Sequence, residues 1–126
     1  MEQKRTLSLL VDNTPGLLSR VAGLFSRRGY NIETITAGVT ADPRYTRMTV
    51  VLYCSDEMIL EQIKKQLNRM VEVIKVIDFT DVFVRMKEIL YIKVFNCSAA
   101  DKVELFQIAE TFKAKVIDYG KDSLLL

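Results

Sequence analysis

Apolar and polar positions along the first 80 residues follow patterns that predict strands and helices in turn. Leu7, Leu9 and Val11 alternate with less apolar neighbours, which is typical of a strand with one buried face. From Leu17 to Phe25 the apolar residues instead recur at helical spacing. The same two criteria predict further strands at 32–38, 46–54 and 71–79 and a second helix at 56–70.

The resulting order, βαββαβ, predicts an α+β fold of the ferredoxin-like kind, in which helices cover one face of an antiparallel sheet. The other face of that sheet is expected to be polar and open, and we expect it to pair with a second copy of the chain. The residues assigned to this open face are Ser8, Glu33, Thr34, Thr36 and Thr49.

The pattern begins again after Thr80. It predicts a strand at 89–95, a helix marked by Leu105, Ile108, Ala109 and Phe112, and strands at 115–119 and 123–126. AETF at 109–112 echoes AGLF at 22–25, a weak internal repeat. We therefore expect a first domain at 1–80 and a second, incomplete ferredoxin-like unit at 81–126. This unit is expected to be truncated or to complete its sheet with another chain.

Composition excludes several classes of protein. The 126 residues are 49% apolar and 27% charged, with a net charge of +2 and no long run of like charge, so neither nucleic acid nor membrane is indicated as a partner. The short apolar run after the polar N-terminus is no signal peptide, and we expect a soluble cytoplasmic protein. RNA binding is disfavoured because only Tyr53 could stack on the middle strands.

No catalytic or metal-binding constellation is visible in the sequence. The chain has no histidine, and Cys54 and Cys97 lie far apart at the ends of apolar runs, where buried reduced thiols are expected. We therefore expect a protein that is not an enzyme and holds no metal of its own.

The stretch DNTPGLL, at 12–18, is the best candidate for a binding site. We assign Thr14 as the helix N-cap, Pro15 as the first helical residue and Gly16 as the second. A helix N-terminus attracts anions, and the Asn13 amide could recognise both charges of an amino acid. The structural alternative makes Asn13 a turn residue, Gly16 a packing glycine and Asn31 a loop former, and spacing leaves both interpretations open.

A family resemblance rests on longer stretches. DNTPGLLSRVAGLFSRRGYNIETITAG at 12–38, TRMTVVL at 46–52 and LEQIKKQLNRMVEVIKV at 60–76 resemble the ACT domain of the regulatory small subunit of acetohydroxyacid synthase, also called acetolactate synthase. EILYIKV at 88–94 and FKAKVIDY at 112–119 resemble the C-terminal domain of the same family.

The resemblance implies a regulatory subunit in branched-chain amino-acid biosynthesis. Its implied partners are a catalytic subunit, which would hold the thiamine diphosphate, magnesium and FAD, and a second copy of the chain. The implied effector is valine or a related amino acid, bound between two ACT domains. The implied site residues are Asn13, Pro15, Gly16, Leu17 and Leu18 of one chain with Asn31 and Ile32 of the other, and Gly38 as the small residue beside the ligand.

An alternative stays open at this point. A stand-alone ACT-domain sensor that regulates a different biosynthetic enzyme would show the same N-terminal pattern. Arg20, Arg27 and Arg28 could then dock such a partner, although a solvated basic helix face is the commoner explanation for charges at this spacing.

Overall fold

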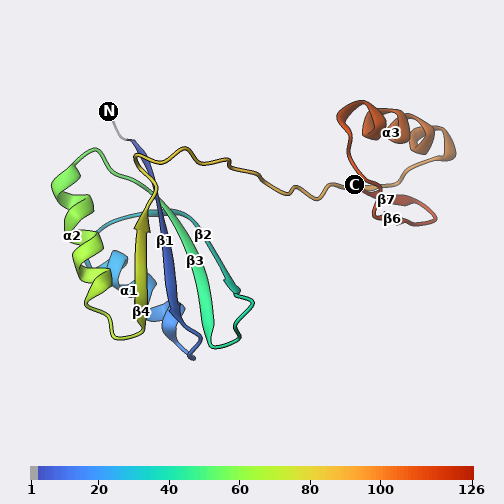
Figure 1. The fold of residues 1–126 in the computed structure, drawn as a ribbon. Helices are drawn as coiled ribbons and strands as arrows, with labels where there is room; N and C mark the ends of the chain where they lie inside the picture. The colour runs from blue at the N-terminus through green and yellow to red at the C-terminus, as the bar shows by residue number, and fades with distance from the viewer. Residues whose placement is uncertain (1–2) are drawn as a thin grey trace. The chain divides into compact units, whose positions relative to one another are not determined.

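The computed structural model describes residues 3–126, which divide into two compact units. The first ends at Val84 and the second begins at Arg85. Each unit has its own antiparallel sheet (Figure 1). Among residues 3–126, no helix is long and apolar enough to cross a membrane.

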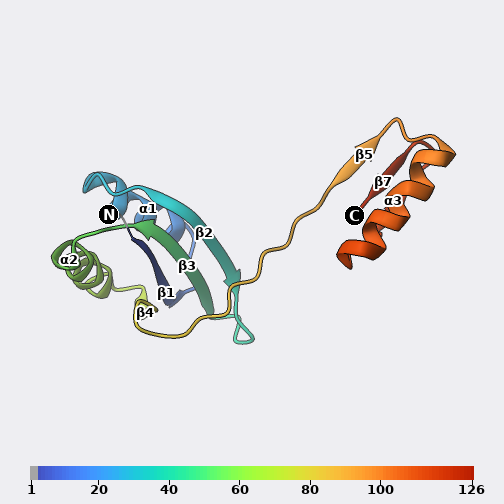
Figure 2. The same cartoon turned by 90° about the horizontal axis from the view of Figure 1, so that it is seen from above.

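The first unit is a four-stranded sheet with two helices on one face, as Figure 2 shows from above. The strand order is β2-β3-β1-β4, and every pairing is antiparallel. This confirms the predicted ferredoxin-like fold. Its elements are β1 (Lys4–Asp12), α1 (Leu17–Arg27), β2 (Ile32–Val39), β3 (Tyr45–Tyr53), α2 (Glu57–Asn68) and β4 (Val73–Asp78).

The core lies between the sheet and the two helices. Leu7, Leu9 and Val11 of the central strand β1 are fully buried, as predicted for the apolar face of this strand, and Thr6 and Ser8 between them are buried as well. The three apolar residues pack with Val21 and Phe25 of α1 in one cluster of buried side chains. Burial of each such side chain stabilises the fold by about 1.5–3 kcal/mol, so this layer holds the first unit together.

The open face of the sheet is only partly free. Ser8 and Thr36 lie opposite Thr49 on the neighbouring strand, as the period of two predicts. The Arg47 Nη1 donates a hydrogen bond of 2.9 Å to the Ser8 hydroxyl, and Ser8 is buried. Glu33 falls where the β2–β3 register shifts, outside the regular alternation. Pairing of this face with a second copy stays a prediction.

The start of the fourth strand was predicted too early. Val71 is 93% exposed, and β4 begins only at Val73. The cause is the tight connection from α2, where the Val73 N–H donates to the Met70 carbonyl. The β1–β4 register shifts between Leu10, which lies opposite Lys75, and Val11, which lies opposite Val73. One extra residue of β4 therefore separates these two pairs, and the apolar alternation is interrupted there.

The second unit consists of β5 (Lys93–Phe95), α3 (Ala99–Phe112), β6 (Asp118–Tyr119) and β7 (Ser123–Leu125). Its strand order is β5-β7-β6. The strands predicted at 89–95 and 115–119 are both too long. The central strand β7 has only three residues, which pair with three residues of β5, and two of them pair with β6. Ile89 is consequently 83% exposed.

The N-terminal end of the helix of the second unit is fixed by side chains. Ser98 and Asp101 form a capping box at its start, which satisfies two otherwise unpaired N–H groups. Lys102 is buried, and its Nζ donates to the carbonyls of Gly120 (2.5 Å) and Lys121 (2.7 Å) in the β6–β7 turn. Of the predicted apolar stripe, Ala109 is buried but Phe112 is 79% exposed.

Candidate functional site

The β1–α1 loop does not begin the helix as the sequence analysis predicted. Helix α1 starts at Leu17, and Gly16 is its N-cap with φ +76° and ψ 0°. The assignment of Thr14 as the cap and Pro15 as the first helical residue is therefore wrong. Glycine stands at position 16 because only a residue without Cβ adopts this left-handed conformation without strain.

The Asn13 side chain is held by the β2–β3 hairpin rather than by its own turn. Its Nδ2 donates to the Pro43 carbonyl at 3.0 Å, and its Oδ1 accepts from the Thr46 hydroxyl at 3.2 Å. The Asn13 N–H donates to the Arg44 carbonyl at 2.8 Å. One N–H and one lone pair of the amide remain for a ligand, in a fixed orientation.

Two ion pairs brace the segments that flank this loop. The Arg20 guanidinium pairs with Glu72 at 2.8 Å, while the Glu72 carbonyl accepts from the Asp12 N–H at 2.8 Å. In the hairpin, the side chain of Arg44 binds both carboxylate oxygens of Asp42 and lowers the pKa of Asp42. The loop between β1 and α1 is thus tied to two neighbouring connections.

A cavity of about 220 Å³ lies beside the loop. It is lined by Asp12, Asn13, Thr14, Gly16, Leu17, Leu18, Ala37, Thr46 and Met48. The lining combines a carboxylate, an amide and hydroxyls with apolar side chains, next to the positive end of α1. This combination suits a small molecule that carries a positive group, a negative group and a short aliphatic side chain.

The structure brings together four of the predicted site residues in one chain. Asn13, Gly16, Leu17 and Leu18 line the cavity, and Pro15 lies in the same loop between Thr14 and Gly16. Ala37, Thr46 and Met48 also line the cavity and were not predicted from the sequence. The signal for them is the strand register, which sets Ala37 opposite Met48 and is not readable from a single sequence.

The other three predicted residues lie away from this cavity. Asn31 and Ile32 are at the start of β2, whereas the cavity adjoins its far end at Ala37. Gly38 lies opposite Arg47 on the open face of the sheet, and a Cβ there would meet nothing within 4 Å. Their predicted role in the site stays a prediction that requires a second copy.

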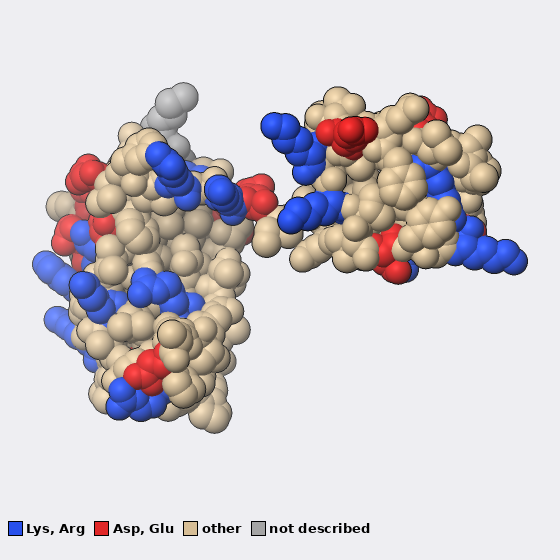
Figure 3. Space-filling view, turned by 45° about the vertical axis from the view of Figure 1, so that its right-hand side comes forward, with Lys and Arg blue, Asp and Glu red and all other residues tan. Residues whose placement is uncertain are grey.

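In the view of Figure 3, both basic and acidic side chains occur on the surface of each unit. Within residues 3–126 no group of three or more acidic or cysteine side chains is placed to hold a metal ion. Both cysteines are buried and free.

The fold and the loop site together define an ACT domain. A sequence model described as the AHAS small subunit-like ACT domain matches residues 7–75, and one described as the small subunit of acetolactate synthase matches residues 87–126. The chain belongs to the family of acetolactate synthase small subunits, and its role is that of a regulatory subunit of acetohydroxyacid synthase.

Individual relatives support this assignment along nearly the whole chain. A probable acetolactate synthase small subunit of Methanothermobacter thermautotrophicus is 42% identical over 94% of this chain and 70% of its own length. The acetolactate synthase small subunit of Bacillus subtilis is 39% identical over 98% of this chain and 71% of its own. The crystal structure of the small subunit from Thermotoga maritima superimposes with a TM-score of 0.78 at 32% identity, covering 98% of this chain and 76% of that one.

Proposed function

We propose that the chain binds a branched-chain amino acid at the β1–α1 loop and thereby confers feedback inhibition on the catalytic subunit of acetohydroxyacid synthase. The observation that carries this proposal is the cavity beside Gly16, where polar groups of both signs adjoin apolar side chains. Valine is the expected effector, with leucine and isoleucine as the related candidates.

The two ends of the cavity suit the two ends of an amino acid. The first N–H groups of α1 have no partner within the helix and carry partial positive charge, which suits a carboxylate. The side chains of Asp12 and Asn13 suit an ammonium group. Leu18 and Met48 offer apolar contact for the effector's aliphatic side chain.

Regulation requires that the effector favours one arrangement of the protein over another. We propose that two copies of the chain share the effector, with Asn31 and Ile32 of the second copy completing the site and Gly38 as the small residue beside the ligand. The cavity in one chain is lined by neither Asn31 nor Ile32, which is consistent with a shared site. An effector that bridges two copies biases their association, and a bound catalytic subunit can respond to that bias.

The chemistry of the reaction belongs to the catalytic subunit in this proposal. That subunit would hold the thiamine diphosphate, magnesium and FAD, while this chain activates it in the cytoplasm and supplies no catalytic residue. A stand-alone sensor for a different enzyme is disfavoured, because both units of the chain match small subunits of acetolactate synthase.

Calorimetric titration of the purified chain tests the site, with valine, leucine and isoleucine as ligands and serine, lysine and phenylalanine as controls. The informative variants are Gly16→Asp and Gly16→Asn, which are nearly isosteric and impose the same backbone strain. Only the aspartate adds a negative charge beside the effector's carboxylate, so we expect Gly16→Asp to abolish binding and Gly16→Asn to retain more of it.

Equal binding by both variants would contradict a carboxylate site at the start of α1. Binding of serine or lysine in preference to the branched amino acids would contradict the apolar part of the proposal.

A further inference from the structure

The β2–β3 hairpin determines which end of the Asn13 amide faces the cavity beside the β1–α1 loop. The Asn13 Nδ2 donates to the Pro43 carbonyl at 3.0 Å, and the Asn13 Oδ1 accepts from the Thr46 hydroxyl at 3.2 Å. A carbonyl oxygen only accepts hydrogen bonds, so the NH₂ end of the amide must turn toward Pro43. The oxygen end is thereby turned toward Thr46, which lines the cavity together with Asn13.

Thr46 is held in place by the strand that carries it. It is the second residue of β3 and lies opposite Val11 of β1 and Val39 of β2. Val11 belongs to the core, so the Thr46 side chain is on the helix-covered face of the sheet, where the residue is only 8% exposed. A buried hydroxyl requires a hydrogen-bond partner, and the Asn13 Oδ1 is the acceptor that it contacts.

The Asn13 and Thr46 oxygens form a site for a hydrogen-bond donor. The Thr46 hydroxyl uses its one proton on Asn13, so its own oxygen can still accept from a ligand, and the Asn13 Oδ1 keeps a second lone pair. The carboxylate of Asp12 lines the same cavity. An ammonium group has three N–H donors, no acceptor and a positive charge, and it therefore matches this set of oxygens better than a carboxylate does.

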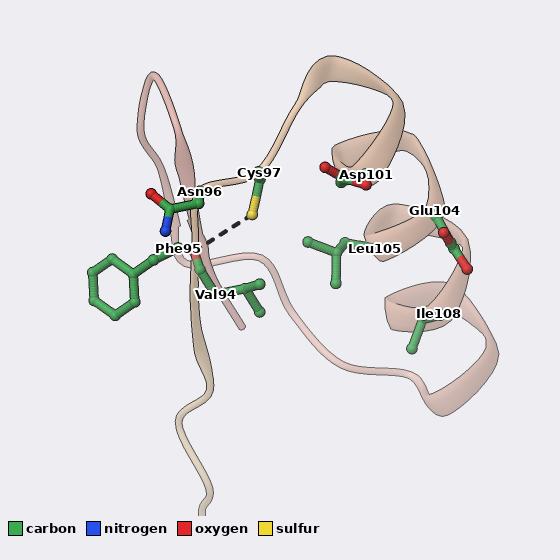
Figure 4. A pocket seen from close by; sticks show the side chains of 8 residues that line it. All are labelled: Val94, Phe95, Asn96, Cys97, Asp101, Glu104, Leu105 and Ile108. Carbon is green, nitrogen blue, oxygen red and sulfur yellow. Dashed lines mark hydrogen bonds between the residues drawn. The ribbon is translucent and has the colours of Figure 1, made fainter.

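The cavity of the second unit, between β5 and α3, uses its polar groups differently. It has a volume of about 280 Å³, and Figure 4 shows Val94 and Leu105 pointing toward each other across it. Its Asp101 carboxylate accepts from the Ser98 N–H at 2.7 Å, and its Cys97 thiol donates to the Val94 carbonyl at 3.6 Å, the dashed line in Figure 4. Asp101 thus serves the cap of α3, and we assign the ammonium site to the cavity of the first unit.

We propose that Thr46 makes the site specific for an amino acid, because its hydroxyl oxygen and the Asn13 amide oxygen that it orients receive the effector's ammonium group together. This inference rests on the proposed function, in which a branched-chain amino acid binds at the β1–α1 loop. The effector's carboxylate is bound separately, at the N-terminus of α1. Thr46 therefore governs the recognition of only one end of the effector.

Calorimetric titration of the full chain with valine, leucine and isoleucine, and with analogues that lack one charged group, tests this role. For valine the analogues are 3-methylbutanoate, which has no ammonium group, and valinamide, which has no carboxylate. Thr46→Val replaces the hydroxyl by a methyl group and keeps the branched shape. We expect it to weaken the binding of valine and of valinamide roughly tenfold, because hydrogen bonds to a charged group are lost. Binding of 3-methylbutanoate, measured by competition, should change little.

Two matched substitutions control for changes in packing. Thr46→Ser keeps the hydroxyl and should bind valine nearly as well as the wild type. Thr49→Val makes the same chemical change on the same strand, but on the open face opposite Ser8, and should leave valine binding unchanged.

A double-variant cycle tests the orienting role. In the Asn13→Ala background, Thr46→Val should weaken valine binding by a smaller factor than it does alone, because part of the effect of Thr46 passes through the Asn13 amide. An undiminished effect would contradict this role.

The outcomes separate this inference from the proposed function. Equal weakening of valine and 3-methylbutanoate by Thr46→Val would overturn the inference, since the residue would then act only through the shape of the site. Unchanged valine binding by Thr46→Val would overturn it as well. If the wild-type chain bound none of the three branched amino acids, the proposed function itself would be contradicted.

Discussion

Replacement of Gly16 by alanine should destabilise the first unit. The residue has φ +76°, and an L-amino acid with a Cβ pays about 1–2 kcal/mol in this left-handed region. Alanine also restricts the unfolded chain, which offsets about 0.4–1 kcal/mol of that cost. The net expectation is a loss of about 1 kcal/mol in the free energy of unfolding. Crowding adds little, since the nearest atom to the new Cβ would be the Arg20 Nη1 at an ordinary 3.6 Å.

Gly23→Ala is a control of the same chemical type with the opposite expected sign. Gly23 lies inside α1, and a Cβ there would meet nothing within 4 Å. Alanine is favoured over glycine inside a helix by about 0.5–1 kcal/mol, so this variant should be more stable than the wild type. Urea unfolding followed by circular dichroism measures both changes, and Gly16→Asn should recover part of the loss because asparagine tolerates the left-handed region.

The reasoning would be refuted if Gly16→Ala were as stable as the wild type or more stable. Destabilisation by Gly23→Ala that equals that of Gly16→Ala would also refute it, because backbone conformation would then not be the cause.

Three further predictions concern the core, an ion pair and a helix cap. Phe25→Ala should cost about 3–5 kcal/mol in unfolding free energy because Phe25 is fully buried, whereas Phe112→Ala, at an exposed position, should change it little in the same denaturation assay. For Asp78, burial alone would raise the pKa, but hydrogen bonds from Thr80 and the nearby Lys64 ammonium outweigh it and lower the pKa. The ionised Asp78 therefore stabilises the fold above its unfolded pKa of about 3.9, and this stabilisation is lost as the pH falls below about 4. In the Asp78→Asn variant, the free energy of unfolding should fall less steeply with decreasing pH below about 4 than in the wild type. Ser98→Ala removes the cap of α3 and should cost about 0.5–2 kcal/mol, measured as reduced amide protection in that helix.

Periodicity was sufficient to predict the first unit because its central elements each place one row of apolar side chains in the core. Leu7, Leu9 and Val11 lie on the helix-covered side of β1, and Leu60, Ile63 and Leu67 form the buried stripe of α2. A local pattern reports this burial directly. The predicted order of elements is confirmed for that reason.

Errors arose where structure depends on neighbours far along the chain. The apolar run from Ile89 to Phe95 looks like a seven-residue strand, yet only Lys93–Phe95 pairs, because the length of β7 sets the limit. The start of α1 was misplaced for a different reason. The Pro15–Gly16 pair is a turn signal, and it was interpreted as the first helical turn instead.

The loop residues of the candidate site were predicted from the sequence, but the strand residues that line its cavity were not. Asn13 and Gly16 could be singled out because a glycine directly follows a proline where the helical pattern begins. Thr46 and Met48 reach the cavity only through the pairing of β3 with its neighbours. The hydrogen bonds that orient Asn13 join it to residues 30 and 33 positions away, and no local pattern indicates them.

The central claim is that this chain regulates acetolactate synthesis in response to a branched-chain amino acid. The most direct measurement is the rate of acetolactate formation by the catalytic subunit alone, with this chain, and with this chain plus increasing valine, leucine or isoleucine. The account predicts a higher rate when the chain is added, a fall with one branched amino acid, and no such fall with Gly16→Asp. A rate that does not change when the chain is added, or inhibition that persists unchanged in Gly16→Asp, would contradict it.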